Sequence, residues 1–352
     1  MGSVHHVTTS SKVLFNKVRK IVPPMLEQFH KVMLFAKGLR PQYVPAPRSL
    51  NSVLMECIQV IKGYSPNLMV HPLLPSTATV KDPRSIDALE LARPIIGMLS
   101  RLHALVVGPG LGRDGVTLQV VAEVLKEARS RSIPFVLDAD GLLIVTENPN
   151  LVKDYKECIL TPNVVEFGRL AKALGVKVAS QAEIAKDGDG NKTSQESDAC
   201  EQLSKALGGV TILQKGPHDV ISNGVTSIIN DIKGGLKRSG GQGDTLTGSL
   251  GTLLAWRAAY HDKLWDAGEQ DNAQEAQNRD EVQAELESEN KRMSPATTLL
   301  LAAWAGSSIT RDSSRRAFEA KGRSMQASDL TDEVHWSFLE LIGEPEGSQA
   351  HL

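Results

Sequence analysis

Residues 103–140, HALVVGPGLGRDGVTLQVVAEVLKEARSRSIPFVLDAD, contain the pattern that decides the fold. The apolar run HALVV predicts a buried strand that ends in a glycine-rich turn, and IPFVL predicts a second buried strand. Between them Val120, Val124 and Leu125 belong to an apolar set that recurs at helical spacing. A strand, a helix and a strand in this order predict a βαβ unit.

The alternation of strands and helices continues on both sides of this unit. Residues 68–74 and 158–163 predict further strands, and residues 82–99 and 164–175 predict helices. Residues 210–231 break the rhythm with three short β runs, separated by turn sequences that favour hairpins. We therefore expect a mainly parallel sheet with helices on both faces, a three-layer α/β/α fold.

The composition limits the classes of function. The chain has 39 basic and 41 acidic side chains, so no basic excess indicates nucleic-acid binding. Its three cysteines form no CxxC pair, which argues against a disulfide framework and a zinc site. No apolar run reaches the roughly 18 residues that a membrane span needs. We expect a cytoplasmic protein with a small-molecule partner and no nucleic-acid or membrane partner; a homo-oligomer is left open.

We expect one domain over residues 1–352, with three unusual segments. Residues 32–59 carry prolines and basic residues without clear periodicity, so we interpret them as loop-like. Residues 186–199 predict a polar surface loop. Residues 261–293 contain ten acids and four bases, which predicts a solvated insertion that is partly helical or disordered.

Residues 234–256, GGLKRSGGQGDTLTGSLGTLLAW, join a glycine-rich turn to a helical run, with Asp244 at the junction. A helix N-terminus offers unpaired N–H groups and a positive dipole end, so it binds anions. Gly240, Gly241 and Gly243 let the backbone approach a ligand closely. A carboxylate there can accept a proton while a phosphoryl group arrives. The alternative is that Asp244 only caps the helix.

Two turns at the ends of predicted strands are also candidates for ligand binding. Residues 108–112 are rich in glycine and indicate either contact with a phosphate or ribose, or a simple tight turn. A dinucleotide fingerprint fits poorly, because Arg113 stands where it needs glycine. Lys215 is either a phosphate-neutralising lysine or a surface lysine. We favour His218 as a turn residue or nucleotide neighbour over a general base.

Acidic and amide side chains follow two of the predicted strands. Asp138 and Asp140 lie after one strand, and Asn163 and Glu166 lie where another gives way to a helix. Acids gathered at one sheet edge suit Mg²⁺, which keeps several waters and needs few carboxylates. Glu166 is thus a candidate metal ligand, although helix capping explains it equally well. Both interpretations stay open, and the metal ligands are otherwise unknown.

Five motifs together resemble a known family. GPGLGRD, DADG, LTPNVVEF, KGPHD and SGGQGDTLTG occur here in the order and spacing of the ATP-dependent NAD(P)H-hydrate dehydratases, in particular the fungal branch. The similarity covers about residues 60–343 and, more weakly, residues 17–31. It implies a ribokinase-like fold. It also implies a hydro-lyase that uses ATP and Mg²⁺ to phosphorylate the S epimer of hydrated NADH or NADPH, and then eliminates phosphate.

The resemblance implies a role for individual residues. Asp244 matches the catalytic position, where it contacts the substrate and removes the proton from its hydroxyl group. The implied contacts to the hydrated dinucleotide are Gly110, Asn163, Val164, Val165, Glu166, Phe167, Gly168 and Arg169. The implied contacts to ATP are Lys215, Gly216, Pro217, His218, Asp219, Gly234, Gly235, Leu236, Lys237, Arg238, Ser239, Gly240, Gly241, Gln242 and Gly243.

Residues 32–59 depart from the family pattern. The family has a first strand, a glycine-rich turn and a TGAP-like segment there, whereas this chain reads VMLFAKGLRPQYVPAPRSLNSVLMEC over residues 32–57. We hypothesise that a splice or frame error, or a real isoform, replaced that piece. An incomplete substrate pocket and reduced or absent activity would follow. The alternative functions are a kinase of a vitamin-precursor alcohol with the same architecture, or an inactive nucleotide-binding protein.

Overall fold

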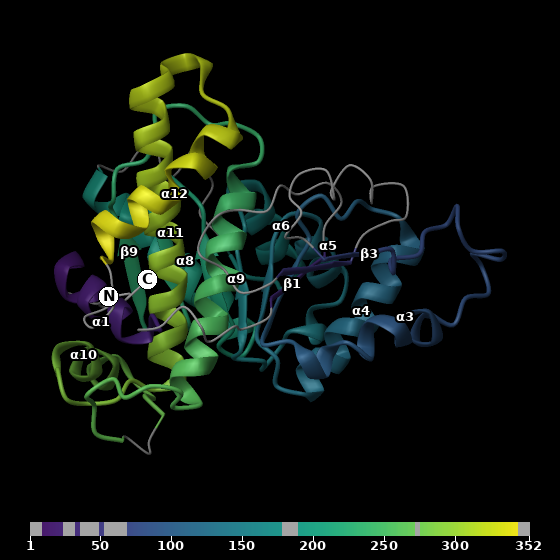
Figure 1. The fold of residues 1–352 in the computed structure, drawn as a ribbon, viewed down its shortest axis with the longest axis horizontal. Coiled ribbons are helices and arrows are strands. Elements are labelled where there is room, and N and C mark those ends of the chain that lie inside the picture. The colour runs from purple at the N-terminus through teal and green to yellow at the C-terminus, as the bar shows by residue number, and fades with distance from the viewer. Residues whose placement is uncertain are drawn as a thin grey trace, which may run out of the picture.

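The computed structural model describes residues 9–23, 32–35, 49–52, 69–177, 189–271 and 275–343. The strands form a nine-stranded sheet in the order β3-β2-β1-β4-β5-β6-β7-β8-β9 (Figure 1). They are β1 Val32–Phe35, β2 Ser49–Ser52, β3 Met69–His71, β4 Ala104–Val107, β5 Phe135–Leu137, β6 Cys158–Leu160, β7 Thr211–Gln214, β8 Asp219–Ser222 and β9 Ser227–Asn230.

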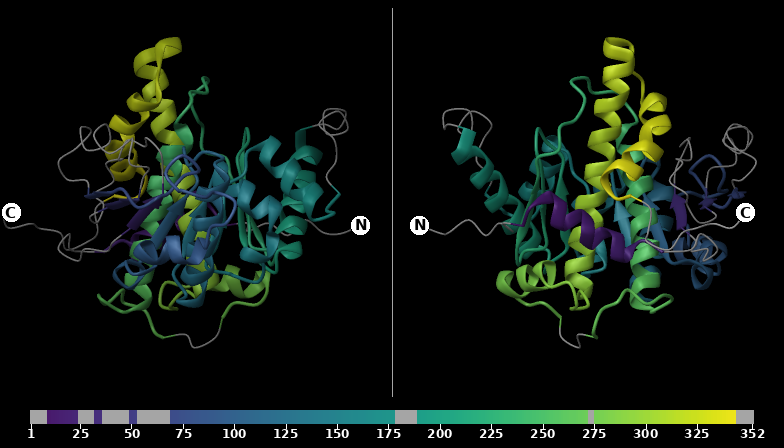
Figure 2. Two further views of the ribbon diagram at one scale, coloured as in Figure 1. Left: turned by 90° about the vertical axis from the view of Figure 1, so that its right-hand side faces the viewer. Right: turned by 60° about the vertical axis from the view of Figure 1, so that its left-hand side comes forward.

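Helices flank this sheet (Figure 2). The α-helices are α1 Ser11–Ile21, α3 Ala88–Ile96, α4 Gly115–Ser130, α5 Asp140–Glu147, α6 Val164–Ala173, α8 Asp189–Ala206, α9 Gln242–His261, α10 Arg279–Glu287, α11 Pro295–Lys321 and α12 Ala327–Leu341. The 3-10 helices are η2 Leu99–Arg101, η3 Pro149–Leu151 and η4 Gly322–Ser324. Within the described ranges, no helix combines the length and apolar character needed to cross a membrane.

The strand directions agree with the sequence patterns. The pairs from β3 through β7 are parallel, and β7, β8 and β9 pair antiparallel as two hairpins. Helices α4, α5 and α6 each follow a parallel strand, as crossover connections require. The mainly parallel sheet and its three-layer arrangement are therefore confirmed.

Two apolar cores lie on the two faces of the sheet. Along β4, Leu105 and Val107 face a core that includes residues of α3, α4, α6 and α8, while Ala104 and Val106 face a core that includes residues of α1, α9, α11 and α12. This alternation is the period-2 geometry of a strand that is buried on both faces. Figure 1 shows α9 and α11 side by side, and α9 contacts β4 and β5 of the sheet.

Helix α1 carries its apolar residues at helical spacing. Leu14, Val18 and Ile21 are buried, and the Phe15 ring lies 4.5 Å from the Trp304 ring of α11, measured between centroids. The N-terminal helix is thereby attached to the same face of the sheet as α9.

Two segments that were expected as loops contain regular structure. Within residues 32–59, β1 and β2 lie in parallel register beside β4, with Val32 opposite Ala104. An open strand edge recruits a short apolar run that has too few residues to show periodicity. Residues 189–199 belong to α8, whose later turns carry buried apolar residues. The loop prediction is therefore wrong for these parts, and the remainder of both segments lies outside the described residues.

The charged insertion, residues 261–293, is packed as well as partly helical. Val282 and Leu286 of α10 are buried against the rest of the protein. The carboxylate of Glu269 lies 3.7 Å from the ammonium of Lys17 and 3.4 Å from that of Lys20, both in α1. The helical prediction holds for α10, and most described residues of the segment are at least partly exposed, as expected. The buried anchors are the exception, because their long-range partners are invisible in the local composition.

Candidate active site

The carboxyl ends of four neighbouring strands lie side by side, and together they form one edge of the sheet, the one that runs across the strand ends. Residues 108–112 follow β4, Asp138 follows β5, Asn163 follows β6 and Lys215 follows β7. Asn163 and Lys215 form a parallel bridge, and the Lys215 backbone N–H donates to the carbonyl of Pro162 at 2.9 Å. Most of the sequence-derived candidates therefore lie along one edge, where open α/β sheets bind ligands.

Asp244 lies in the first turn of α9. The helix begins after Gly241, which adopts a left-handed conformation with φ of 96° and provides no side-chain cap. A residue with a Cβ would be strained there, so glycine is required. In the described part of the chain the Asp244 carboxylate accepts no capping hydrogen bond, and the Asp244 backbone N–H donates to the Gly241 carbonyl at 3.0 Å. The capping explanation of Asp244 thus has no support in the geometry.

The surroundings of Asp244 change its proton affinity. Burial raises its pKa to about 6, the negative charge of Asp138 raises it as well, and the positive charge of Lys215 acts in the opposite direction. A carboxylate with this pKa is ionised at neutral pH and still takes up a proton more readily than an exposed one. These are the properties of a general base.

Lys215 and Asp138 form a close ion pair. The Lys215 ammonium donates to Oδ1 of Asp138 at 2.6 Å, and the two side chains are 25% and 4% exposed. The sequence left a surface lysine as one option for Lys215. The structure instead places it partly buried at the sheet edge, on a carboxylate that is enclosed by the fold.

A cavity of about 930 Å³ opens beside this pair. Its lining brings together the implied substrate side and the implied ATP side. From the sequence-derived residues the lining contains Asn163, Val164, Val165, Lys215, Gly216, Pro217, His218, Asp219, Gly234, Gly235, Leu236, Arg238, Ser239, Gln242 and Gly243. A volume of this size suits a nucleotide or part of a dinucleotide.

The carboxylate of Asp219 holds the turn that follows Lys215. Its Oδ1 accepts from the Gly216 N–H at 2.9 Å and from Arg311 at 3.2 Å, and its Oδ2 accepts from the Ser307 hydroxyl at 2.7 Å. Arg311 also donates to the carbonyls of Gly216 and Pro217. The Asp219 carboxylate is therefore occupied in shaping the turn.

Asn163 and Glu166 form a capping box at the start of α6. Asn163 Oδ1 accepts from the N–H groups of Val165 and Glu166 at 2.9 and 3.0 Å, and Glu166 accepts from the Asn163 N–H at 2.8 Å. This is the capping interpretation of Glu166. Its role as a metal ligand stays an untested prediction.

Other sequence-derived residues lie outside the cavity lining. Phe167 is buried in the apolar core, so its side chain does not reach a ligand. The Lys237 ammonium donates to the carbonyls of Arg323 and Met325, both at 2.7 Å, and so fastens its loop to η4. The remaining residues of this group are Gly110, Glu166, Gly168, Arg169, Gly240, Gly241 and Asp244.

The donor set at this edge suits a magnesium ion that arrives with nucleotide phosphates. Among the described residues, no group of three or more His, Cys, Asp or Glu side chains could form a metal cage. Mg²⁺ bound to ATP needs only one or two protein carboxylates, because phosphate oxygens and water supply the rest. The site therefore fits a nucleotide-borne ion.

Several residues that line the cavity are not indicated by the sequence motifs. Arg311 and Ser314 project from the middle of α11, which reads in sequence as a long buried helix. An arginine within such a helix is the signal that could have indicated a partner, since buried charges are normally paired. The other missed lining residues are Asp231, Lys233, Leu246 and Thr310.

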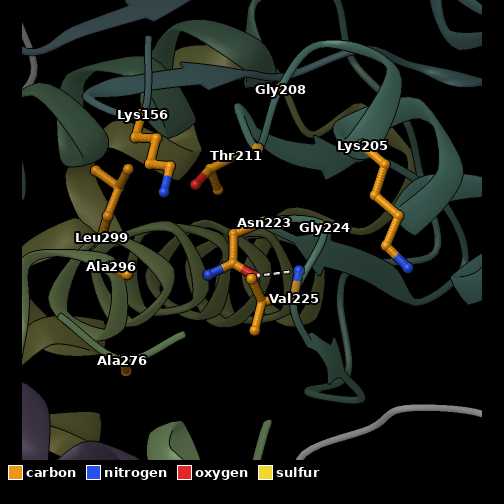
Figure 3. Close-up of a pocket in the computed structure, with 11 residues that line it drawn as sticks. Lys156, Lys205, Gly208, Thr211, Asn223, Gly224, Val225, Ala276, Ala296 and Leu299 are labelled. Atoms are coloured by element: carbon orange, nitrogen blue, oxygen red, sulfur yellow. Dashed lines mark hydrogen bonds between the residues drawn. The ribbon is translucent and has the colours of Figure 1, made fainter. Parts of the chain in front are cut away.

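A second cavity of about 250 Å³ lies at the amino end of β7 (Figure 3). It contains Lys156, Thr211 and Asn223, and apolar residues such as Leu299 close one side. Its described lining includes no aspartate or glutamate. It therefore lacks a carboxylate base of the kind that Asp244 provides.

Comparison with known proteins identifies the family. A profile of the NAD(P)H-hydrate dehydratase family matches residues 50–335. The ATP-dependent (S)-NAD(P)H-hydrate dehydratase of Aspergillus fumigatus is 72% identical over 366 residues, which cover 99% of each chain. The proteins of the same name from Schizosaccharomyces pombe and Mus musculus are 39% and 35% identical, over 94% and 96% of this chain and 93% and 88% of theirs.

Solved structures confirm the fold. A ribokinase-like superfamily protein from Enterococcus faecalis superposes with a TM-score of 0.60 at 14% identity, covering 95% of this chain and 96% of its own. The ADP/ATP-dependent NAD(P)H-hydrate dehydratase of Bacillus subtilis, crystallised with ATP and Mg²⁺, gives a TM-score of 0.54 at 14% identity, covering 97% and 100%. The fold is therefore ribokinase-like, and the chain belongs to the NAD(P)H-hydrate dehydratase family.

Proposed function

We propose that this protein is an ATP-dependent hydro-lyase that converts the S epimer of hydrated NADH or NADPH back to the dinucleotide. The relatives carry this activity in their names. The observation that carries the proposal is Asp244, a partly buried carboxylate with a pKa of about 6 at the start of α9. It stands next to Gly243, which lines the large cavity.

In the first step, Asp244 accepts the proton of the substrate hydroxyl. The hydroxyl oxygen then attacks the terminal phosphorus of ATP, the bond to ADP breaks, and a phosphate ester forms. The N–H groups of residues 240–243 and the Lys215 ammonium stabilise the charge on the transferring group. Mg²⁺, when bound with ATP, neutralises phosphate charge. We assign residues 215–219 and 234–243 to ATP, and Gly110 and residues 163–169 to the hydrated dinucleotide, with the buried Phe167 side chain holding that segment on the core.

In the second step, phosphate leaves with the electron pair of the carbon–oxygen bond. The adjacent carbon gives its proton to water, the electron pair of that carbon–hydrogen bond forms the new double bond, and the dihydronicotinamide ring is restored. Phosphorylation is needed because hydroxide is a poor leaving group and phosphate a good one. The sum is the conversion of hydrate and ATP to NAD(P)H, ADP and phosphate.

Two exposed apolar side chains support a ligand with flat rings. Val165 and Leu236 are 62% and 89% exposed, and both line the large cavity. Large apolar side chains that face a cavity are typical of ligand contacts. We propose that bases or the nicotinamide ring cover them in the complex.

The test is incubation of the purified protein with ATP, Mg²⁺ and hydrated NADH. Return of the dihydronicotinamide absorbance together with ADP supports the proposal. A stable phosphorylated alcohol without that absorbance would indicate a kinase instead. ATP binding without turnover would indicate the inactive alternative. For the cellular location we propose the cytoplasm, which microscopy of a tagged protein tests.

Residues 32–59 are the segment whose effect on activity is to be tested. The family profile begins at residue 50. The alignment with the Aspergillus fumigatus relative runs over 366 residues, and this chain has 352, so the relative has positions without a counterpart here. We propose that this segment was altered and that activity is reduced as a result. Sequencing the transcript decides between a gene error and an isoform, and a normal rate of turnover would contradict the loss of activity.

A further inference from the structure

Asp138 connects the base and the lysine of the site. Its carboxylate follows β5, and the residue is 3% exposed. Oδ1 accepts from the Lys215 ammonium at 2.6 Å. In the described part of the chain, Oδ2 accepts no hydrogen bond. The carboxylate is therefore half occupied, with its second oxygen turned toward the start of α9.

Two glycines in contact with Asp138 leave space for its carboxylate and its backbone carbonyl. A Cβ on Gly243 would lie 2.9 Å from Asp138 Oδ2, and a Cβ on Gly108 would lie 1.8 Å from the Asp138 carbonyl oxygen. Both glycines thus leave room for Asp138. Ala139, the next residue, has φ of 48°, which is unfavourable for any residue with a side chain. A strained residue persists where its surroundings fix it in place.

Gly243 is the last glycine of the GGQGD sequence, and its position explains why a glycine stands there even without a ligand. A side chain at residue 243 would collide with the carboxylate of Asp138. The first turn of α9, which carries Asp244, is thus packed directly on Asp138. The charged side chains that act on Asp244 within the described ranges are Asp138 and Lys215.

We propose that Asp138 is a positioning residue for phosphoryl transfer: it aims the Lys215 ammonium at the phosphate site and sets the charge that Asp244 experiences. This inference rests on the proposed function. An ammonium has three donors, so Lys215 can keep one hydrogen bond to Asp138 while two others contact the phosphoryl group. Asp138 acts through these two neighbours and does not touch the reacting atoms.

An ion pair that only held the fold together, without acting on the charge of Asp244, would leave the pKa of Asp244 unchanged when either partner is replaced. Removal of the Asp138 charge takes a negative neighbour away from Asp244 and leaves the Lys215 charge uncompensated, so the pKa of Asp244 falls. Removal of the Lys215 charge leaves Asp138 uncompensated, so the pKa of Asp244 rises. Opposite shifts from the two halves of one ion pair are the signature of the proposal.

The experiment is a titration of Asp244 by NMR with carboxyl-labelled aspartate, with the signal assigned by its loss in Asp244→Asn. We compare the wild type with Asp138→Asn and Lys215→Met. We expect the midpoint to fall by about one pH unit in Asp138→Asn and to rise by a similar amount in Lys215→Met. Where hydrated NADH is turned over, the acid limb of kcat/KM follows the same shifts, and kcat of Asp138→Asn falls by about 10- to 100-fold with KM for the hydrate unchanged.

Asp140→Asn is the matched control. Asp140 lies two residues away, but its carboxylate accepts from the Gly112 N–H at 3.0 Å and from Arg113 at 3.2 Å. The midpoint of Asp244 should stay in place in this variant. An Asp138→Asn midpoint equal to that of Asp140→Asn, or moved in the same direction as in Lys215→Met, overturns the proposal. If either variant fails to fold, the other still decides by the sign of its shift. The titration needs no turnover, so a wild type without activity contradicts the proposed function alone.

Discussion

Two cavities lie at the two ends of strand β7. They share some residue types but differ in their acidic residues. Both are lined by lysine and glycine residues, Lys215 and Gly216 at one end and Lys156 and Gly224 at the other. The carboxyl end adds the acids Asp138 and Asp244 and the start of a 20-residue helix. The amino end has no acid among its described lining residues. A lysine beside a glycine turn is thus common in a fold, whereas an acid under a helix N-terminus marks the reaction site.

The largest expected effect comes from removing the base at the carboxyl end. Asp244→Asn keeps the size of the side chain and should lower kcat by about 10²- to 10⁴-fold, the range for loss of a general base. Steady-state turnover of hydrated NADH measures this. ATP binding by calorimetry should persist as the control, and an unchanged rate would remove Asp244 from the mechanism.

The second test removes the ion pair that holds the turn of residues 215–219 at the carboxyl end of β7. Arg311→Met leaves Asp219 without its buried cation, and loss of one partner of a buried pair costs about 3–5 kcal/mol of unfolding free energy. Urea denaturation measures the change. The matched control is Arg93→Met, which breaks an exposed pair with Glu90 and should cost about 0–1 kcal/mol. Equal losses in both variants would show that Arg311 does not hold the turn.

The dependence of the rate on pH gives a smaller effect. Asp244 has a raised pKa of about 6 and acts as a base in its ionised form, so activity is present above that pH and is lost below it. The value of kcat/KM should fall about tenfold per unit below pH 6 and level off above pH 7. Samples returned to neutral pH should regain full activity, which separates titration from unfolding. A profile that stays flat down to pH 4.5 is incompatible with this assignment.

The smallest effect is expected at the amino end. Lys156→Ala removes a lysine of the small cavity, which lies at the opposite end of β7 from the site of Asp244. The change should alter kcat and KM for ATP by no more than about twofold. The same assay measures it next to Asp244→Asn. A loss beyond tenfold would mean that the two cavities are functionally connected.

The parts of the fold that the sequence predicts are those with local causes. The βαβ unit, the two hairpins and the helix after Asp244 follow from apolar periodicity and turn residues. The site edge follows as well, because parallel strands end at one edge and their following residues meet there. In the structure this edge brings Asn163 and Lys215 together as a parallel bridge.

The parts that escaped prediction depend on contacts between distant segments. Asp219 looks like a nucleotide contact in sequence, and the structure also gives its carboxylate a partner, Arg311, that lies 92 residues later. The polar start of α8 is helical although it reads as a loop. The insertion packs because Glu269 pairs with lysines of the N-terminal helix. No local pattern contains these partners.

Helix α9 bears the base at its first turn and is buried along most of its length between the sheet and α11. The catalytic carboxylate is thus mounted on the central framework of the molecule, not on a lid that can melt separately. On heating, activity and global tertiary structure should disappear together at one temperature. Inhibitors that work by displacing a mobile loop would find nothing to displace at Asp244.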